Sequence, residues 1–234
     1  MSGEKGLPTV SHQALGGVVL FSDLSVDDLS DLAATCHWAR YRKGQDIVAE
    51  RDNTTNVYFV CSGRVRATTY STTGREVTYG DLVTGDLFGE LAALDEKPRS
   101  IFVVALEESL IASLDSKLFR QLVESQPTVL WRLMGGLVGR IRTLTERVYE
   151  LNTLGAVNRI HAELLRLGES GVTSEGIATI DPAPTHLEIA NRCNTTRESV
   201  NREFTNLKKL GVVETEGHAL LILDMQALRK MIQG

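Results

Sequence analysis

Hydrophobic and polar positions alternate in short runs over the first half of the chain. An amphipathic segment, Ser25–Cys36, comes first, with Ser25 as its expected helix cap. Residues 39–115 then consist of short β-branched stretches separated by glycine-containing turns, where positive φ costs glycine little. The stretches are Asp46–Ala49, Val57–Val60, Val65–Tyr70, Val77–Tyr79 and Ile101–Ala105. This pattern predicts an all-β roll or barrel.

A different period begins near Pro127 and predicts a long helix over residues 127–153. Apolar residues recur alternately four and three positions apart, at Leu130, Met134, Leu137, Ile141, Leu144, Val148 and Leu151. This spacing is the seam of a coiled coil over about three heptads. A helix packed only on its own domain is the alternative, but the heptads and the flanking arginines (Arg132, Arg140, Arg142, Arg147) favour self-pairing. We expect a parallel homodimer through residues 127–153.

The last third of the chain has the pattern of a winged helix-turn-helix. A helix (Val157–Leu167), a loop and a short strand (Ile177–Ile180) precede two helices joined by a tight turn at Cys193–Asn194. Thr185 and Glu188 form the capping box that opens the first of these helices. A hairpin with its turn at Glu216–Gly217 supplies the wing, and a closing helix starts at Asp224.

The second of the two helices has an apolar face and a hydrogen-bonding face. It begins at Thr195 or Thr196, and Val200, Phe204 and Leu207 share one side. The opposite side carries Arg197, Glu198, Asn201, Arg202, Thr205 and Lys208. Such side chains can read base edges in a major groove, since Arg bonds guanine and Glu accepts from cytosine. The alternative is a solvated face on which Glu198 completes a capping box with Thr195; the adjoining wing favours DNA binding.

A second cluster has the chemistry of a sugar-phosphate site. Phe88-Gly89-Glu90-Leu91 is followed by Pro98-Arg99-Ser100. A glycine before a short helical turn leaves amides for an anion, and the planar fork of Arg99 suits a phosphate. The hydroxyl of Ser100 is a further donor, and Glu90 can accept from a ribose hydroxyl. The chain has no G-x-x-x-x-G-K-[ST] loop, which argues against a hydrolysed nucleoside triphosphate.

Composition adds bounds to this picture. The length of 234 residues favours two domains over one, and a hydrophobic share of 42% is enough for a proper core. The net charge of -5 does not indicate a nucleic-acid binder, but a binding face depends on local charge. We expect a cytoplasmic protein, because no run approaches the ~18 apolar residues of a membrane helix and no signal peptide is present. The widely spaced cysteines (Cys36, Cys61, Cys193) are expected to be reduced and mostly buried.

The predicted fold class is α+β. An N-terminal β-roll, similar to a double-stranded β-helix or jelly roll, is followed by a long dimerisation helix and a C-terminal winged helix-turn-helix. The expected divisions are a flexible tail (1–17), a β-roll domain (18–126) that carries the sugar-phosphate cassette, the dimerisation helix (127–153) and the DNA-binding domain (154–234).

From about Leu20 to Leu223 the sequence resembles the cyclic AMP receptor protein/FNR superfamily of bacterial transcription regulators. The most specific matches are the Phe88–Leu91 and Pro98–Ser100 cassette and the run Thr196-Arg197-Glu198-Ser199-Val200-Asn201-Arg202. The resemblance implies an allosteric regulator that binds cAMP, cGMP or both. It implies DNA with TGTGA-like palindromes, a second copy of the chain and RNA polymerase as partners, and no enzyme activity.

The resemblance also implies site residues. Glu90 would bind the ribose, Arg99 and Ser100 the cyclic phosphate, and Arg197, Glu198 and Arg202 the bases. The full nucleotide set is Gly89, Glu90, Leu91, Ala92, Arg99, Ser100, Thr143, Leu144 and Thr145. The full DNA set is Thr196, Arg197, Glu198, Asn201, Arg202 and Lys208.

The sequence leaves the ligand open and argues against a metal-dependent site. Where the family has a threonine–serine pair for adenine, this chain has Leu144-Thr145, so cAMP and cGMP both remain candidates. A regulator of the same fold with another effector, or none, is the second interpretation. A β-roll enzyme of the cupin kind is disfavoured, because no histidine lies between His37 and His161 to bind a metal. The same gap argues against haem, and the tail lacks the cysteines of an iron–sulfur site.

Overall fold

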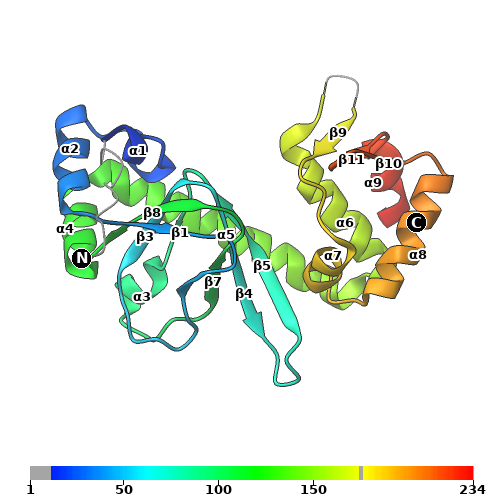
Figure 1. Ribbon diagram of the computed structural model, residues 1–234, viewed down its shortest axis with the longest axis horizontal. Coiled ribbons are helices and arrows are strands. Elements are labelled where there is room, and N and C mark those ends of the chain that lie inside the picture. Colours follow the sequence, from blue (N-terminus) through cyan, green and yellow to red (C-terminus); the bar gives the residue numbers. More distant parts are fainter. Residues whose placement is uncertain (1–11, 174–175, 234) are drawn as a thin grey trace, which may run out of the picture. The chain divides into compact units, whose positions relative to one another are not determined.

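The computed structural model describes residues 12–173 and 176–233, which form two compact units (Figure 1). The first unit contains residues up to Thr69 together with Tyr79–Arg140, and the second contains Tyr70–Thr78 and the chain from Ile141 onward. The fold is a mixed α and β fold with an N-terminal β-roll, a long helix and a winged helix-turn-helix, as the sequence predicts.

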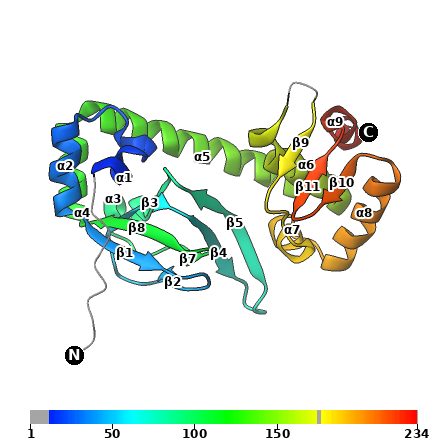
Figure 2. The same cartoon turned by 45° about the horizontal axis from the view of Figure 1, so that its top comes forward.

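The β-roll consists of two four-stranded sheets. Figure 2 labels their strands except the two-residue β6. One sheet has the order β1-β8-β3-β6 and the other β2-β7-β4-β5. The pairs β1–β8, β3–β8 and β4–β7 are antiparallel, with Phe59 opposite Ala112 in the middle of β3 and β8. The strands are β1 (His37–Tyr41), β2 (Asp46–Val48), β3 (Val57–Ser62), β4 (Arg64–Tyr70), β5 (Glu76–Val83), β6 (Leu87–Phe88), β7 (Phe102–Ala105) and β8 (Ser109–Leu114).

Short helices pack on this roll. They are α1 (His12–Gly16), a 3-10 turn (Val19–Phe21), α2 (Val26–Thr35), α3 (Glu90–Asp95) and α4 (Ser116–Ser125). The predicted cap of α2 is confirmed, since the Ser25 side chain accepts a hydrogen bond from the Asp28 amide at 3.1 Å. Phe21 and Phe59 are both fully buried, with ring centroids 4.8 Å apart, so the helical layer and the sheet share one core.

The predicted flexible tail over residues 1–17 is wrong for residues 12–16. Residues 12–16 form α1, and Leu15 is fully buried in the core of the first unit. The sequence did not predict this helix, because it is only five residues long, buries one apolar side chain and ends at the Gly16–Gly17 pair. Such a short segment shows no helical period. Residues 1–11 lie outside the described part of the chain.

The predicted helix of residues 127–153 is α5 (Pro127–Thr153). Pro127 occupies its first position, where a missing N–H costs nothing. Val129 and Leu133 are buried against the first unit, and Leu137 is partly packed there. Most of the predicted seam, by contrast, is exposed in the single chain: Leu130, Met134, Ile141, Leu144, Val148 and Leu151.

The second unit is built on a three-stranded sheet with the order β10-β11-β9. Its strands are β9 (Ala178–Ile180), β10 (Val213–Glu216) and β11 (Ala219–Ile222), and its helices are α6 (Ala156–Gly168), a 3-10 turn (Glu169–Gly171), α7 (His186–Arg192), α8 (Arg197–Lys209) and α9 (Met225–Gln233). The predicted wing is therefore the β10–β11 hairpin, with Gly217 at φ +56° in its turn. The apolar face predicted for the second helix is confirmed, since Val200 and Leu207 are fully buried and Phe204 nearly so.

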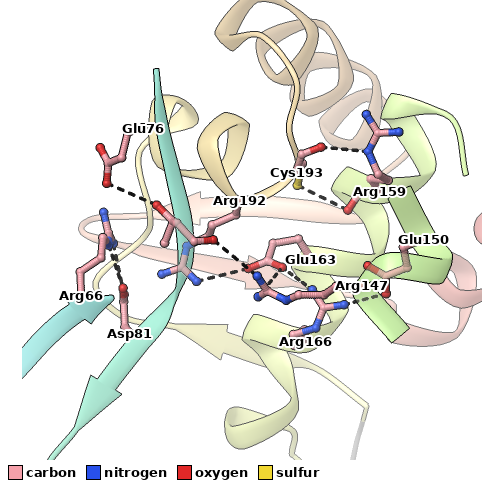
Figure 3. A network of polar contacts seen from close by, with 11 residues as sticks. Arg66, Glu76, Asp81, Arg147, Glu150, Arg159, Glu163, Arg166, Arg192 and Cys193 are labelled. Atoms are coloured by element: carbon pink, nitrogen blue, oxygen red, sulfur yellow. Dashed lines mark hydrogen bonds and ion pairs between the residues drawn. The ribbon is translucent and has the colours of Figure 1, made fainter. Parts of the chain in front are cut away.

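A network of charged side chains around one buried carboxylate joins α5, α6 and α7 within this unit (Figure 3). Glu163 of α6 is 2% exposed and lies at its centre. Its carboxylate forms ion pairs with Arg166, with Arg192 at 3.3 Å and with Arg147 at 3.6 Å. Arg166 in turn bonds Glu150 at 2.6 Å. The end of the long helix and the first helix of the helix-turn-helix are thus held through one carboxylate.

The cysteines and the apolar character of the helices can also be compared with the expectations from the sequence. Cys36, Cys61 and Cys193 are buried free thiols, as expected. Among the residues that the structure describes, none of the helices has both the length and the apolar character needed to cross a membrane.

Candidate functional site

Gly89 is the pivot of the cassette predicted for a sugar phosphate. It follows β6, adopts φ +83° and caps the N-terminus of α3. A Cβ atom at this position would lie 2.6 Å from Arg99 Nη1 and 2.8 Å from the carbonyl oxygen of Asn56. Both the backbone angle and the close approach require glycine.

Arg99 lies inside the roll, directly against this turn. It is 4% exposed, and it donates from Nη1 to the Gly89 carbonyl at 2.9 Å and from Nη2 to the Asn56 carbonyl at 2.7 Å. Its Nε donates to Thr54 Oγ1 at 3.1 Å. Burial lowers the pKa of Arg99 from its ordinary value, although a guanidinium stays charged at neutral pH. These three bonds do not use all five N–H donors, so the group can still bind an anion.

The face of the Arg99 guanidinium is also supported. Its central carbon lies 5.4 Å from the centroid of the Tyr58 ring, which stacks on Phe88 with centroids 5.0 Å apart. A cation over an aromatic ring is attracted by the ring quadrupole. The planar fork is therefore held in place by β3 and β6 before any ligand binds.

Glu90 is buried beside Arg99 and has a partner that the sequence did not assign. The carboxylate is on a residue only 2% exposed, and its Oε1 accepts from Arg140 Nη1 at 2.6 Å. Arg140 also donates from Nη2 to the Leu87 carbonyl at 2.6 Å. The sequence showed Arg140 only as a basic residue beside the heptad seam, and nothing in its spacing indicated a contact with the cassette.

The remaining predicted nucleotide ligands differ in position. Ala92 is buried in α3, whereas Leu91 and Ser100 are exposed at the edge of the cassette. Thr143, Leu144 and Thr145 lie on α5 in the second unit, and the Thr145 hydroxyl donates to the Ile141 carbonyl of its own helix at 2.9 Å. The structure joins Gly89 and Arg99 by a direct hydrogen bond, while the Glu90 carboxylate next to Gly89 bonds Arg140. A nucleotide-binding role for Thr143, Leu144 and Thr145 stays a prediction.

The predicted helix-turn-helix is present in the second unit. The Thr185–Glu188 capping box is confirmed, and Asn194 takes φ +48° in the turn. Helix α8 is capped by Thr196, whose Oγ1 accepts from the Ser199 amide at 3.2 Å. The alternative capping box between Thr195 and Glu198 is wrong, because Thr195 lies before the cap.

The predicted DNA-reading side chains lie on one exposed side of α8. Arg197, Glu198, Asn201, Arg202 and Lys208 are all exposed. The Glu198 carboxylate accepts from its own amide and from the Thr196 hydroxyl, and these bonds lower its pKa. Its charge is therefore held at the start of the helix. Asn201 makes a contact that the sequence did not predict, with His186 of α7.

Possible metal ligands are spread over the chain. Within residues 12–173 and 176–233, no three or more histidine, cysteine, aspartate or glutamate side chains gather in an arrangement that could hold a metal ion.

Comparisons with known proteins match both units. The cyclic nucleotide-binding domain model matches residues 38–126, and the Crp-like helix-turn-helix domain model matches residues 158–231. The chain is 28% identical over 198 residues to the cAMP-activated global transcriptional regulator Vfr of Pseudomonas aeruginosa, covering 83% of this chain and 92% of Vfr. It is 27% identical over 191 residues to a CRP-like cAMP-activated global transcriptional regulator of Mycobacterium tuberculosis, covering 81% of this chain and 85% of that protein.

The fold is also similar to a solved structure. A mutant of CooA from Carboxydothermus hydrogenoformans superposes with a TM-score of 0.79 and is 22% identical, with 97% of this chain and 98% of that chain covered. This similarity shows a shared fold.

Proposed function

Because the chain belongs to the cyclic AMP receptor protein/FNR family of cyclic nucleotide-binding, DNA-binding transcription regulators, we propose that cAMP or cGMP controls its binding to TGTGA-like palindromes as a homodimer. On this proposal the nucleotide binds the β-roll and biases two arrangements of the DNA-binding helices. RNA polymerase is the expected third partner.

The observation that carries the proposal is the buried pairing of Arg99 with the Gly89 turn. A buried guanidinium needs acceptors, and here three neutral oxygens supply them, while the Glu90 and Asp52 carboxylates act on the charge through space rather than by an ion pair with Arg99. A positive charge held without a counter-ion among these bonds favours an anion of the size of a phosphate. Ser100, next in sequence, adds a hydroxyl donor, and Glu90 is the acceptor for a ribose hydroxyl.

On this proposal, residues of α5 select the base of the nucleotide. Leu144 has no hydrogen-bonding atom in its side chain, and the Thr145 hydroxyl already donates to the Ile141 carbonyl. That hydroxyl can still accept from an exocyclic amino group, and Thr143 lies close in sequence. The relatives named as cAMP-activated favour cAMP, and cGMP remains the second candidate.

Self-pairing through α5 is supported by the exposed apolar seam. Ile141 is 62% exposed and Val148 58% exposed in the single chain. Such a stripe on a monomer marks a surface that is covered in the functional protein. Pairing two chains would present two copies of α8 to half-sites roughly 34 Å apart.

A regulator of the same fold that takes no cyclic nucleotide is the second candidate. It is favoured by Leu144 and by the Arg140–Glu90 pair, which satisfies the Glu90 carboxylate without any ribose. The two candidates differ in whether the chain, stripped of nucleotide, binds cAMP or cGMP at all.

Calorimetry with both nucleotides, followed by binding to a TGTGA-type palindrome, tests the proposal. We expect Arg99→Ala and Arg99→Lys to lose nucleotide binding and nucleotide-dependent DNA binding. Arg99→Lys keeps the charge but loses the fork, which separates phosphate recognition from charge alone. Arg51→Ala is the matched control, because the Arg51 side chain is 88% exposed. Nucleotide-dependent DNA binding that survives in both Arg99 variants would refute the proposal.

A further inference from the structure

His186 and Asn201 form a contact between the two helices of the helix-turn-helix. His186 is the first residue of α7, and Asn201 lies in the second turn of α8. The Nδ1 atom of His186 is hydrogen-bonded to the Oδ1 atom of Asn201. The imidazole also packs on Phe204, with ring centroids 4.6 Å apart and planes inclined by 50°.

The direction of this hydrogen bond follows from its atoms. A carboxamide oxygen only accepts, so the proton must be on His186 Nδ1. The packing on Phe204, which is itself 5% exposed, fixes the plane of the imidazole. A fixed donor then determines the side chain torsion of Asn201, with its oxygen toward α7 and its amino group at the other end of the amide.

The amino end of Asn201 is available for another partner. Asn201 is exposed on the same side of α8 as Arg197 and Arg202, and its Nδ2 makes no hydrogen bond to any residue in the described part of the chain. A free asparagine can use both ends of its amide, for example on adenine N6 and N7. An asparagine whose oxygen is engaged presents mainly a donor.

We propose that His186 is a specificity-determining residue, because it orients the Asn201 amide so that Asn201 reads hydrogen-bond acceptors on base edges. Guanine O6 and N7, adenine N7 and thymine O4 are such acceptors, whereas cytosine offers only its N4 donor in the major groove. His186 acts through Asn201 and is a positioning residue. The inference rests on the proposed reading of bases by α8.

Three variants separate the hydrogen bond from the packing. His186→Phe keeps an aromatic ring on Phe204 but removes the donor, and His186→Gln restores an N–H donor. Asn201→Ala removes the amide itself. His37→Phe, at an exposed histidine in β1, is the matched control for the loss of an imidazole.

The experiment is selection from DNA duplexes with a randomised half-site, using the full chain with cAMP. The position that Asn201→Ala relaxes identifies the base under Asn201. There we expect the unmodified protein and His186→Gln to disfavour cytosine by about threefold to tenfold, the worth of one hydrogen bond. His186→Phe should reduce this discrimination to less than about twofold. Without the His186 donor, the Asn201 amide can turn and accept from cytosine N4. His37→Phe should leave the selection unchanged.

The possible failures can be told apart. If His186→Phe keeps the discrimination that Asn201→Ala loses, the orienting role of His186 is refuted. If Asn201→Ala changes nothing while Arg197→Ala alters the selected sequence, Asn201 does not read a base and the inference fails alone. If neither variant alters the selection, the proposed reading of DNA by α8 fails with it. Melting temperatures of all variants exclude unfolding as the cause.

Discussion

Arg140 donates from Nη1 to Glu90 Oε1 across 2.6 Å, and Glu90 is almost fully buried beside the Gly89 turn. A carboxylate in this position requires a partner, because an unpaired buried charge is costly. A ribose hydroxyl that bonds Glu90 must either share the carboxylate with Arg140 or displace the Arg140 guanidinium from it. The pair is therefore both a structural contact and the competitor of the proposed ligand.

The first prediction concerns the ribose hydroxyl. We expect 2′-deoxy-cAMP to bind the unmodified protein about tenfold more weakly than cAMP, since it lacks one hydrogen bond to a charged acceptor. In Glu90→Gln the preference for cAMP should fall below about threefold, because only a neutral amide oxygen remains to accept from the hydroxyl. Calorimetric titration of both proteins with both ligands measures the difference. A tenfold preference that persists in Glu90→Gln would show that another group recognises the hydroxyl.

The second prediction concerns Gly89. Gly89→Ala should destabilise the first unit by about 1–3 kcal/mol and abolish nucleotide binding. The added Cβ would collide with Arg99, and alanine would have to adopt φ +83°, which is strained for a residue with a Cβ. Gly80→Ala in β5 is the control, since its Cβ would have no atom within 4 Å. Thermal unfolding and nucleotide titration of the two variants check this. Equal melting temperatures would contradict the strain argument.

Part of the nucleotide cassette and of the helix-turn-helix could be predicted from the sequence, because these parts depend on residues close together along the chain. The turn residue Gly89 and the cap Thr185 depend on neighbours within a few positions, so residue type and spacing predict them. The partners Arg140 and Asn56 are 50 and 43 residues away from the groups that they bond, Glu90 and Arg99. Closure of the roll brings Asn56 to Arg99, and the packing of α5 on the first unit brings Arg140 to Glu90. Their types are compatible with many surface roles, which is why the sequence left them unassigned.

The third prediction concerns the charge network around Glu163. Glu163→Gln leaves Arg147, Arg166 and Arg192 without their common anion in a poorly solvated position. We expect the variant to lose about 3 kcal/mol in the free energy of unfolding. Glu146→Gln, on an exposed residue of α5, is the matched control and should lose less than about 0.5 kcal/mol. Urea denaturation followed by circular dichroism measures both. Similar losses in the two variants would mean that the network contributes no stability.

The fourth prediction concerns the thiols. Burial raises the pKa of Cys36 and Cys193 to about 12 and that of Cys61 to about 11, from an ordinary 9.0. The thiolate is the reactive form, so iodoacetamide at pH 8 should label the native chain very slowly and all three cysteines after unfolding in urea.

The same shifts give a direction for stability against pH. Above about pH 9 the unfolded thiols lose protons that the folded thiols keep, so the unfolded state gains stability as the pH rises toward 12. The thiol contribution to the free energy of unfolding is therefore intact below pH 9 and decreases above it. Rapid labelling of the native protein at pH 8 would show that the thiols are accessible and would contradict both expectations.

The fifth prediction concerns pairing through α5. Ile141 is 62% exposed in the single chain and lies on the predicted seam, so Ile141→Glu should leave each chain folded while placing two like charges at the proposed interface. Gly139→Glu adds the same charge to the same helix at a position off the seam, where a Cβ has no atom within 4 Å. We expect Ile141→Glu to sediment as a monomer and Gly139→Glu as a dimer. Because a palindrome is read by two copies of α8, the monomer should also lose binding to the full site while its helix content stays unchanged. A dimer that survives Ile141→Glu with full DNA affinity would place the contact between chains elsewhere than the seam, and the exposed stripe on α5 would then need another partner.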